Sequence, residues 1–457
     1  MSPTANRASF DLGELLAHNH GGADVEMAVV QRPPAGFWRA SRHPLMLSVV
    51  AALSILVYCF TLWPIPTQRM TTTTPHSALR PHVATDYPYY REPVIPSTTE
   101  NDFEGIWARA WTPWPRRRQL ACPRPVPNMT SAQVQERVPV EQGLVLVRPL
   151  KTGSSTALSV HTRLGRNRAR KVGQEDCNTR YHHASARRIA PQRDREHSLL
   201  WSVIRDPTRR LVSLYFYQGM TAEDADSFLD YIKDKVRHGS AEKIFNHYLR
   251  RLAINQDLPP GVQEMTSLDF AKSFPPFTPP NVTYAAHIFN EYVMKEYDFI
   301  AVTERMDESM VAMSLLFHIP LGDVLYLKPG KTQGGWAVDP DSPTCRFIAK
   351  GSASSDMQSF FRTDQWQEMT RWDIAMYRAA DRSLDLTIEA LGAKRFQATL
   401  NRYQTAMKEV ERRCVPKVPL PCSPDGVFTN QTDCMYLDCG CGNSCIDEVA
   451  RDLGIDR

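Results

Sequence analysis

Two consecutive units of strand, polar loop and helix constrain the fold of this 457-residue chain more than any other feature. In the first unit, an apolar run at 143–149 precedes a polar loop at 151–156 and a helix-compatible stretch at 157–164. In the second unit, an apolar strand at 198–206 runs directly into a helical stretch at 207–217. Strands that alternate with helices predict an α/β fold, here a phosphate-loop-like central parallel sheet flanked by helices.

The first loop has the composition of an anion-binding site. Lys151 opens it, Gly153 allows a tight turn, and hydroxyl side chains follow up to Thr156. Backbone N–H groups of such a loop and of the following helix start converge on one point, and a lysine adds positive charge. The usual nucleotide-triphosphate loop places its lysine after the glycines, so this loop does not fit that template. Magnesium-dependent triphosphate hydrolysis is therefore disfavoured.

The second loop places Arg205 at the carboxyl end of a buried strand. Asp206 is suited to cap the next helix, and Pro207 is favourable as its first residue. Open α/β sheets bind ligands at the carboxyl ends of their strands, where an arginine can hold a phosphate. A local ion pair between Arg205 and Asp206 is the alternative reading.

An uncharged run of 19 residues at 45–63 is long enough to cross a bilayer as a helix. A cleaved signal peptide is the rival reading, but its apolar core should be shorter and nearer the N-terminus. Arginines crowd the preceding side, which predicts a cytosolic tail at 1–44, a membrane signal anchor at 45–63 and a lumenal remainder. The lumenal part is expected to divide into a stem at 64–142, a catalytic domain at 143–412 and a cysteine-rich tail at 413–457.

The stem is expected to be an extended spacer. Residues 64–127 hold twelve of the 34 prolines, and proline blocks both helices and sheet pairing. The aromatic clusters at 87–90 and 111–114 leave open a second reading, in which they pack on the catalytic domain.

Six of the ten cysteines lie in the tail, which predicts disulfides in an oxidising compartment and a tail that is stapled outside the sheet and its helices. A zinc site is the alternative, although paired Cys-x-x-Cys units are missing. Nine cysteines follow the span, so at least one is expected to be free or paired between chains. The sequons at Asn128, Asn281 and Asn430 lie on the expected lumenal side and are candidate glycosylation sites.

Composition and charge narrow the class of protein. With 42% hydrophobic and 23% charged residues the chain cannot be wholly disordered. The formal net charge is only +4, and ten Lys/Arg against three Asp/Glu fall between Arg163 and Arg195. This focused charge can attract an anionic acceptor or form a solvated basic face. No nucleic-acid partner is expected, and a homodimer stays open.

The two loops together resemble the donor-binding loops of membrane-bound carbohydrate sulfotransferases. Lys-Thr-Gly-Ser-Ser-Thr at 151–156 is similar to their 5′-phosphosulfate loop, and Arg-Asp-Pro-x-x-Arg-x-x-Ser at 205–213 is similar to their 3′-phosphate loop. A third block at 299–327 resembles the galactose-3-O-sulfotransferase family. The resemblance spans roughly 143–395. It departs from that family at Arg148-Pro-Leu-Lys151, where a His-Lys-Thr run is expected.

This resemblance implies sulfuryl transfer from 3′-phosphoadenosine 5′-phosphosulfate to a sugar hydroxyl of a glycan or glycolipid, with the 3-OH of galactose as one candidate. It further implies a Golgi membrane location and no metal. Lys151 would stabilise the leaving phosphate oxygen. The remaining implied donor contacts are Thr152, Gly153, Ser154, Ser155 and Thr156 for the 5′-phosphate, and Arg205 and Ser213 for the 3′-phosphate.

The acceptor hydroxyl also needs a base, and a histidine with a near-neutral pKa suits that role. His182 and His183 lie between the two loops in sequence, as a histidine pair does in similar sulfotransferases, and His183 is the preferred candidate. Glu304 is a second candidate base. His161 and His197 are less suitable.

Two other functions remain open. The first is a catalytically silent lumenal protein that binds glycans or serves as a scaffold. The second is a glycosyltransferase, for which Asp224-Ala-Asp226 is the available metal motif, although it is better read as helix-capping charge.

Overall fold

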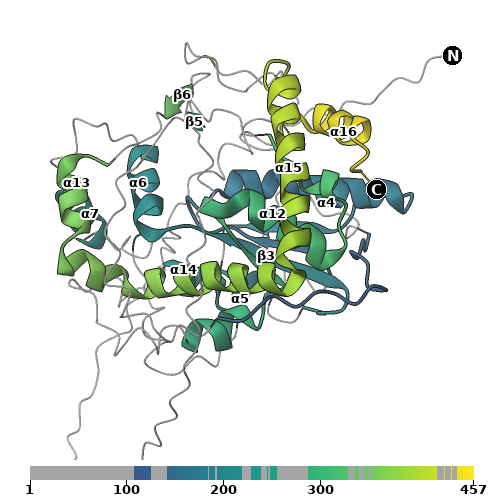
Figure 1. The fold of residues 1–457 in the computed structure, drawn as a ribbon. Helices are drawn as coiled ribbons and strands as arrows, with labels where there is room; N and C mark the ends of the chain where they lie inside the picture. The colour runs from purple at the N-terminus through teal and green to yellow at the C-terminus, as the bar shows by residue number, and fades with distance from the viewer. Residues whose placement is uncertain are drawn as a thin grey trace, which may run out of the picture. The chain divides into compact units, whose positions relative to one another are not determined.

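Four parallel strands form the central sheet of this computed structural model, in the order β2-β1-β3-β4. They are β1 (Gly143–Val147), β2 (Thr179–His182), β3 (Ser198–Ile204) and β4 (Phe299–Val302). Every residue of β1, β3 and β4 is buried, as expected for parallel strands covered on both faces. The predicted α/β class with a parallel sheet is confirmed, and helices flank this sheet (Figure 1).

The structure describes residues 108–124, 142–183, 185–190, 193–218, 228–237, 244, 247–254, 287–327, 335–338, 345–348, 353–418, 427, 434 and 440–456. All of them belong to one compact unit that spans 93–457. The apolar run at 45–63, the three sequons and the Asp224-Ala-Asp226 triplet lie outside these residues. Among the helices that are described, none is both long enough and apolar enough to cross a membrane.

The strand order places a topological switch point between β1 and β3. Strand β1 pairs with β2 through Val147 and His182, and on its other side with β3 through Leu146 and Trp201. The chain therefore moves from β1 to one side and then crosses to the other. Such a reversal is where open α/β sheets bind ligands, at the carboxyl ends of the two strands concerned.

Each of the three buried strands leads into a helix. Helix α4 (Ser154–Lys171) follows β1, α6 (Pro207–Tyr217) follows β3, and α12 (Met306–Phe317) follows β4 after the short 3-10 turn η5 (Thr303–Arg305). The Asp206 carboxylate accepts the Arg209 N–H at 2.8 Å, and Pro207 is the first residue of α6. The predicted cap is confirmed.

The remaining elements lie outside the central sheet, and two of them form a separate two-stranded sheet. They are α5 (Ala186–Ile189), α7 (Phe228–Arg237), α8 (His247–Leu252), the π-helix η4 (Asn290–Met294), the 3-10 turn η6 (Leu321–Val324), the antiparallel pair β5 (Gly335–Val338) and β6 (Cys345–Ile348), α13 (Ser355–Phe361), α14 (Asp364–Leu391), α15 (Ala393–Cys414) and α16 (Asn443–Asp452). Figure 1 shows the long helix α14 running along the lower part of the view and α15 rising steeply from its end.

Tryptophans from the proline-rich segment enter the core. Trp111 packs edge-on against Phe299 of β4, with ring centroids 5.7 Å apart. The Trp114 ring centroid lies 4.8 Å from that of Phe317, and the backbone N–H of Trp114 donates to Leu316 O. Residues 108–124 of the expected stem therefore pack on the domain, which is the second reading left open for the aromatic cluster at 111–114.

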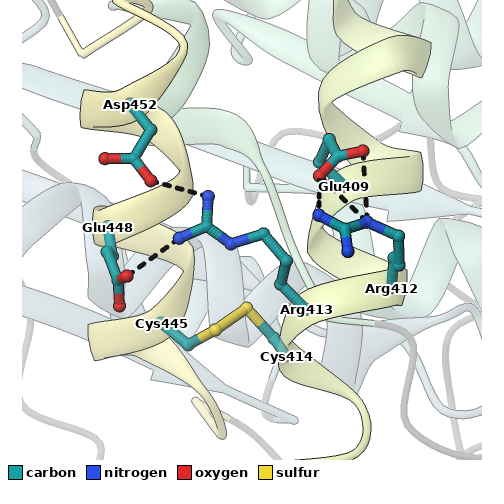
Figure 2. Close-up of a disulfide and its surroundings, with 7 residues drawn as sticks. All are labelled: Glu409, Arg412, Arg413, Cys414, Cys445, Glu448 and Asp452. Atoms are coloured by element: carbon teal, nitrogen blue, oxygen red, sulfur yellow. Dashed lines mark hydrogen bonds and ion pairs between the residues drawn. A yellow bond between two sulfur atoms is a disulfide. The ribbon is translucent and has the colours of Figure 1, made fainter.

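The cysteine-rich tail is held by disulfides. Cys414 at the end of α15 is bonded to Cys445 at the start of α16, as Figure 2 shows, and Cys434 is bonded to Cys441. A further disulfide joins Cys122 to Cys177. The disulfide prediction for the tail is confirmed at these positions. The expectation that the tail sits outside the fold is corrected, because one face of α16 belongs to the apolar core; that face consists of Ile446, Val449 and Ala450.

Asp447 on the same helix ties the tail to α4. Its carboxylate pairs with Arg163 at 2.8 Å, Arg170 at 3.0 Å and Arg166 at 3.2 Å. Burial alone would raise the pKa of Asp447, but the three guanidinium groups hold it below its usual value. The Arg163 side chain is only 1% exposed, so its positive charge depends on the Asp447 carboxylate for compensation.

Candidate functional site

The two predicted phosphate-binding loops meet at the carboxyl edge of the sheet. Lys151 follows β1 and Arg205 follows β3, and Arg205 Nη1 lies 3.4 Å from Lys151 O. The short block after β4, which begins with Thr303, contacts both loops: Thr303 Oγ1 lies 2.6 Å from Thr152 O and 2.9 Å from Ile204 O. Three strand ends therefore converge on one place.

The loop after β1 is tightly folded. Lys151 has a φ of 63°, in the left-handed region that is uncommon for residues other than glycine, and Gly153 has a φ of 74°. The buried Thr152 donates its hydroxyl to Pro149 O at 2.9 Å. Its side chain therefore holds the loop together.

The start of α4 is suited to an anion. Its N-cap is Gly153, no side chain caps the helix, and its first turn carries no acidic residue. Ser154, Ser155 and Thr156 form that first turn. A helix start of this kind presents backbone N–H groups and the positive end of the helix dipole toward the loop.

Tyr217 contacts the lysine of the loop, a feature that sequence reasoning did not find. The Lys151 ammonium lies 3.8 Å from the centroid of the Tyr217 ring, which is within the range of a cation–π interaction. Tyr217 is the last residue of α6 and is 43% exposed. Its position in the aromatic run 215–217 was the available signal, but sequence alone does not say which ring faces the lysine.

Arg205 is fixed by backbone and side-chain contacts. Its N–H donates to the Tyr248 hydroxyl at 3.2 Å, and that hydroxyl donates in turn to Arg205 O. Arg205 Nε lies 3.7 Å from Glu304 Oε1, an ion pair too long to be a hydrogen bond. Ser213, the other implied 3′-phosphate contact, lies on α6 about 9 Å along the helix from Pro207.

Glu304 is largely buried beside Arg205, and its environment shifts it toward the protonated form. It accepts the Asp206 N–H at 3.2 Å. Burial and the negative charge of Asp206 raise the pKa of Glu304 to about 7, although Arg205 opposes the shift. Burial likewise raises the pKa of Asp206. A carboxyl group that titrates near neutral pH beside a cation is typical of functional sites.

His183 follows β2 at the same edge of the sheet. Its Nδ1 lies 2.7 Å from Arg148 O. A carbonyl oxygen only accepts, so the Nδ1 must carry the proton and the neutral ring keeps its basic lone pair on Nε2. Arg251 Nη1 donates to His183 O. His182 is the last residue of β2, and its side chain lies outside the described part of the structure.

The surroundings of His183, first by desolvation and then by positive charge, favour the neutral imidazole. The pKa of His183 lies well below its usual value because the surrounding protein displaces water from the ring, although the residue retains an exposed surface. Positive charges on Arg148, Arg251 and Lys151 add to this shift. A neutral imidazole at physiological pH can accept a proton, as a general base must.

The other candidate histidines lie elsewhere. His161 is buried in the core, where its Nδ1 accepts the Trp201 indole N–H at 3.0 Å. His197 precedes β3 and pairs with Asp194 at 2.7 Å. Neither histidine lies at the carboxyl edge of the sheet. This agrees with the expectation from their sequence positions that they are less suitable as the base.

A buried support behind the first loop was also missed. His247 Nε2 accepts the Leu150 N–H at 3.0 Å, and the buried Asp373 accepts the backbone N–H groups of His247 and Tyr248. Burial raises the pKa of Asp373 to about 6. These residues come from 247–248 and 373, so only the tertiary fold brings them to the loops.

The basic segment between Arg163 and Arg195 is largely used in ion pairs. Besides the arginines that pair with Asp447, Arg193 pairs with Asp298 at 2.7 Å. Arg195 pairs with Glu296 at 2.5 Å. Within the part of the chain that the structure describes, no three His, Cys, Asp or Glu side chains are grouped to hold a metal ion.

Comparison with known proteins gives two similar relatives. The chain is 23% identical to galactosylceramide sulfotransferase of Mus musculus over 364 residues, which cover 72% of this chain and 75% of the relative. It is 22% identical to galactosylceramide sulfotransferase of Homo sapiens over 323 residues, which cover 63% and 66% of the two chains. No family model matches the chain. At low identity, these similarities support a sulfotransferase family for this chain.

Proposed function

We propose that this chain transfers a sulfuryl group from 3′-phosphoadenosine 5′-phosphosulfate to a sugar hydroxyl of a glycan or glycolipid. The observation that carries the proposal is the meeting of the Lys151 loop and Arg205 at one edge of the sheet, between β1 and β3. Both sit where an open α/β sheet binds an anionic nucleotide. The similarity to galactosylceramide sulfotransferases supports the same reaction.

We assign donor binding to groups that follow β1 and β3, on the two sides of the switch point. The backbone from Thr152 onward and the first turn of α4 hold the 5′-phosphate, and Arg205 holds the 3′-phosphate with Ser213. Glu304 orients the Arg205 side chain through their 3.7 Å ion pair. Lys151 stabilises the negative charge that develops on the leaving phosphate oxygen.

His183 is the proposed general base. The acceptor oxygen forms a bond to sulfur while the bond from sulfur to the phosphate oxygen breaks, and the hydroxyl proton passes to Nε2 of His183. The hydrogen bond from Nδ1 to Arg148 O fixes the tautomer this step needs. Glu304 is the second candidate, since its pKa of about 7 also permits proton transfer.

The acceptor and the location follow from the relatives and the sequence. The relatives are named for galactosylceramide, so the 3-OH of a galactose on a glycolipid or glycan is the proposed position. The run at 45–63 would hold the enzyme in the Golgi membrane with its catalytic domain lumenal.

Binding of the product nucleotide tests the proposal. Calorimetry with adenosine 3′,5′-bisphosphate should show saturable binding to the purified full-length chain, and Arg205→Gln should weaken it by about tenfold or more. Arg412→Gln is the matched control, because Arg412 is exposed and pairs with Glu409 far along α15. If the wild-type chain does not bind this nucleotide, the proposed function is wrong.

A further inference from the structure

Two adjacent residues of α8 each hold one of the two donor loops. His247 Nε2 accepts the backbone N–H of Leu150, the residue before Lys151, at 3.0 Å. The hydroxyl of Tyr248 accepts the backbone N–H of Arg205 at 3.2 Å and donates to Arg205 O. The segment that follows β1 and the segment that follows β3 are therefore bonded to neighbouring positions of one helix.

Asp373 fixes the start of that helix. Its carboxylate accepts the backbone N–H of His247 at 3.2 Å and that of Tyr248 at 3.1 Å. The first N–H groups of a helix have no partner within the helix, so another group must supply one where the helix start is buried. Asp373, His247 and Tyr248 are all fully buried. One carboxylate on α14 therefore anchors both residues that contact the loops.

Burial makes each of these contacts difficult to replace. If His247 loses its imidazole or Tyr248 its hydroxyl, a backbone N–H of a loop is left without its acceptor beside buried side chains. The loop must then move to find another partner. Burial also raises the pKa of Tyr248, so its hydroxyl stays protonated and able to donate to Arg205 O.

The proposed reaction depends on where the two loops lie. Lys151 has a φ of 63°, a conformation that few residues other than glycine adopt, and the contact from His247 fixes the chain just before it. Arg205 Nη1 lies 3.4 Å from Lys151 O, so the two loops touch. A displacement of about 1 Å at a reacting centre can cost about a hundredfold in rate. Thr303 also contacts both loops, so loss of one contact from α8 should shift a loop without unfolding it.

We propose that His247 and Tyr248 are positioning residues for the two donor loops, anchored together by Asp373. His247 acts through Lys151 and therefore affects turnover. Tyr248 acts through Arg205 and therefore affects the affinity for the nucleotide. The inference rests on the proposed function and adds to it residues that act on the donor site through hydrogen bonds to the backbone of the loops.

Tyr248→Phe tests the contact to Arg205, because it removes the hydroxyl and keeps the ring. Calorimetry on the purified full-length chain should show binding of adenosine 3′,5′-bisphosphate weakened by about five- to tenfold. Tyr403→Phe on α15 is the matched control, since Tyr403 is equally buried and its hydroxyl donates to Val324 O at 3.0 Å. The control should lower the midpoint of urea unfolding to a similar extent and leave the nucleotide affinity unchanged.

His247→Leu tests the contact to the loop of Lys151. It should lower kcat for transfer of labelled sulfate by about tenfold and change the Kd of the nucleotide by less than about twofold. His247→Gln can place an amide oxygen near the position of Nε2 and should restore most of the turnover. In a Lys151→Ala background, His247→Leu should cause no further loss, because the group through which it acts is gone.

The proposal is supported if the variants separate in this way, with turnover lost in His247→Leu and affinity lost in Tyr248→Phe. It is overturned if both variants keep wild-type kcat and Kd, or if each lowers kcat and affinity together. It is also overturned if His247→Gln is as impaired as His247→Leu, or if Tyr403→Phe weakens nucleotide binding as much as Tyr248→Phe. In all these cases the wild-type chain still binds the nucleotide and transfers sulfate, so the proposed function stands. A wild-type chain that does neither overturns both.

Discussion

Replacing Asp447 by asparagine should destabilise the fold, because it breaks a buried charge network between the C-terminal helix and α4. Asparagine keeps the size of the side chain but removes the charge that compensates Arg163, which is 1% exposed. Removal of one partner from a buried ion pair costs about 3–5 kcal/mol. Arg163 also donates to Gly322 O at 2.6 Å and to Leu325 O at 3.2 Å, so part of its hydrogen bonding survives. We therefore expect a loss of about 3 kcal/mol, at the lower end of that range.

Urea unfolding of the purified chain, followed by tryptophan fluorescence, measures this loss as a lower midpoint with an unchanged slope. Glu409→Gln is the matched control, because it neutralises one partner of the exposed Glu409–Arg412 pair and should leave the midpoint unchanged. The pKa of Asp447 is lowered in the folded chain, so its contribution is fully present above the unfolded pKa of about 3.9 and fades as the pH falls further. The difference between wild type and variant should shrink below about pH 4. Equal midpoints at pH 7 would refute the reasoning.

Three further predictions concern the site and the tail. Tyr217→Ala should lower kcat by about two- to fivefold through loss of the ring beneath Lys151, whereas Tyr217→Phe should retain wild-type turnover; equal losses in both would assign the effect to the hydroxyl. Replacing Cys414 and Cys445 together by alanine should lower the free energy of unfolding by about 3–4 kcal/mol, because the disulfide closes a loop of 31 residues, and an unchanged urea midpoint would contradict this. If His183 is the base, the acid limb of the kcat/KM pH profile should lie well below pH 6.5, since its pKa is depressed; a limb near pH 7 would instead point to Glu304.

Local sequence signals predicted the sheet and the two loops. The buried strands β1 and β3 read as short apolar runs, and each is followed at once by residues with a defined structural task, such as Asp206 as a helix cap. Because strand, loop and helix are adjacent in the chain, no knowledge of distant contacts is needed. That Lys151 and Arg205 would share one edge followed from the expected parallel arrangement of their strands.

Long-range contacts account for what the sequence did not predict. Trp111 reads as part of a proline-rich spacer, yet it packs on β4, almost two hundred positions away. Asp447 reads as part of a disulfide-stapled tail outside the sheet, yet it pairs with three arginines of the basic segment. Asp373 supports the loop after β1 through His247. Composition and periodicity describe a segment and its neighbours, so they cannot identify partners that only the tertiary fold supplies.

Transfer of labelled sulfate by wild-type and Lys151→Ala protein, measured side by side, tests the central claim most directly. The wild-type chain should transfer sulfate from 3′-phosphoadenosine 5′-phosphosulfate to at least one acceptor among neutral galactosides, charged glycans and glycolipids. Lys151→Ala should fold normally and lose about a hundredfold or more in turnover, since removal of a charge that stabilises the leaving oxygen costs about 3 kcal/mol. Wild-type turnover in Lys151→Ala would contradict the assignment of the loop after β1 to catalysis, and no transfer by the wild-type chain to any acceptor would contradict the proposed reaction itself.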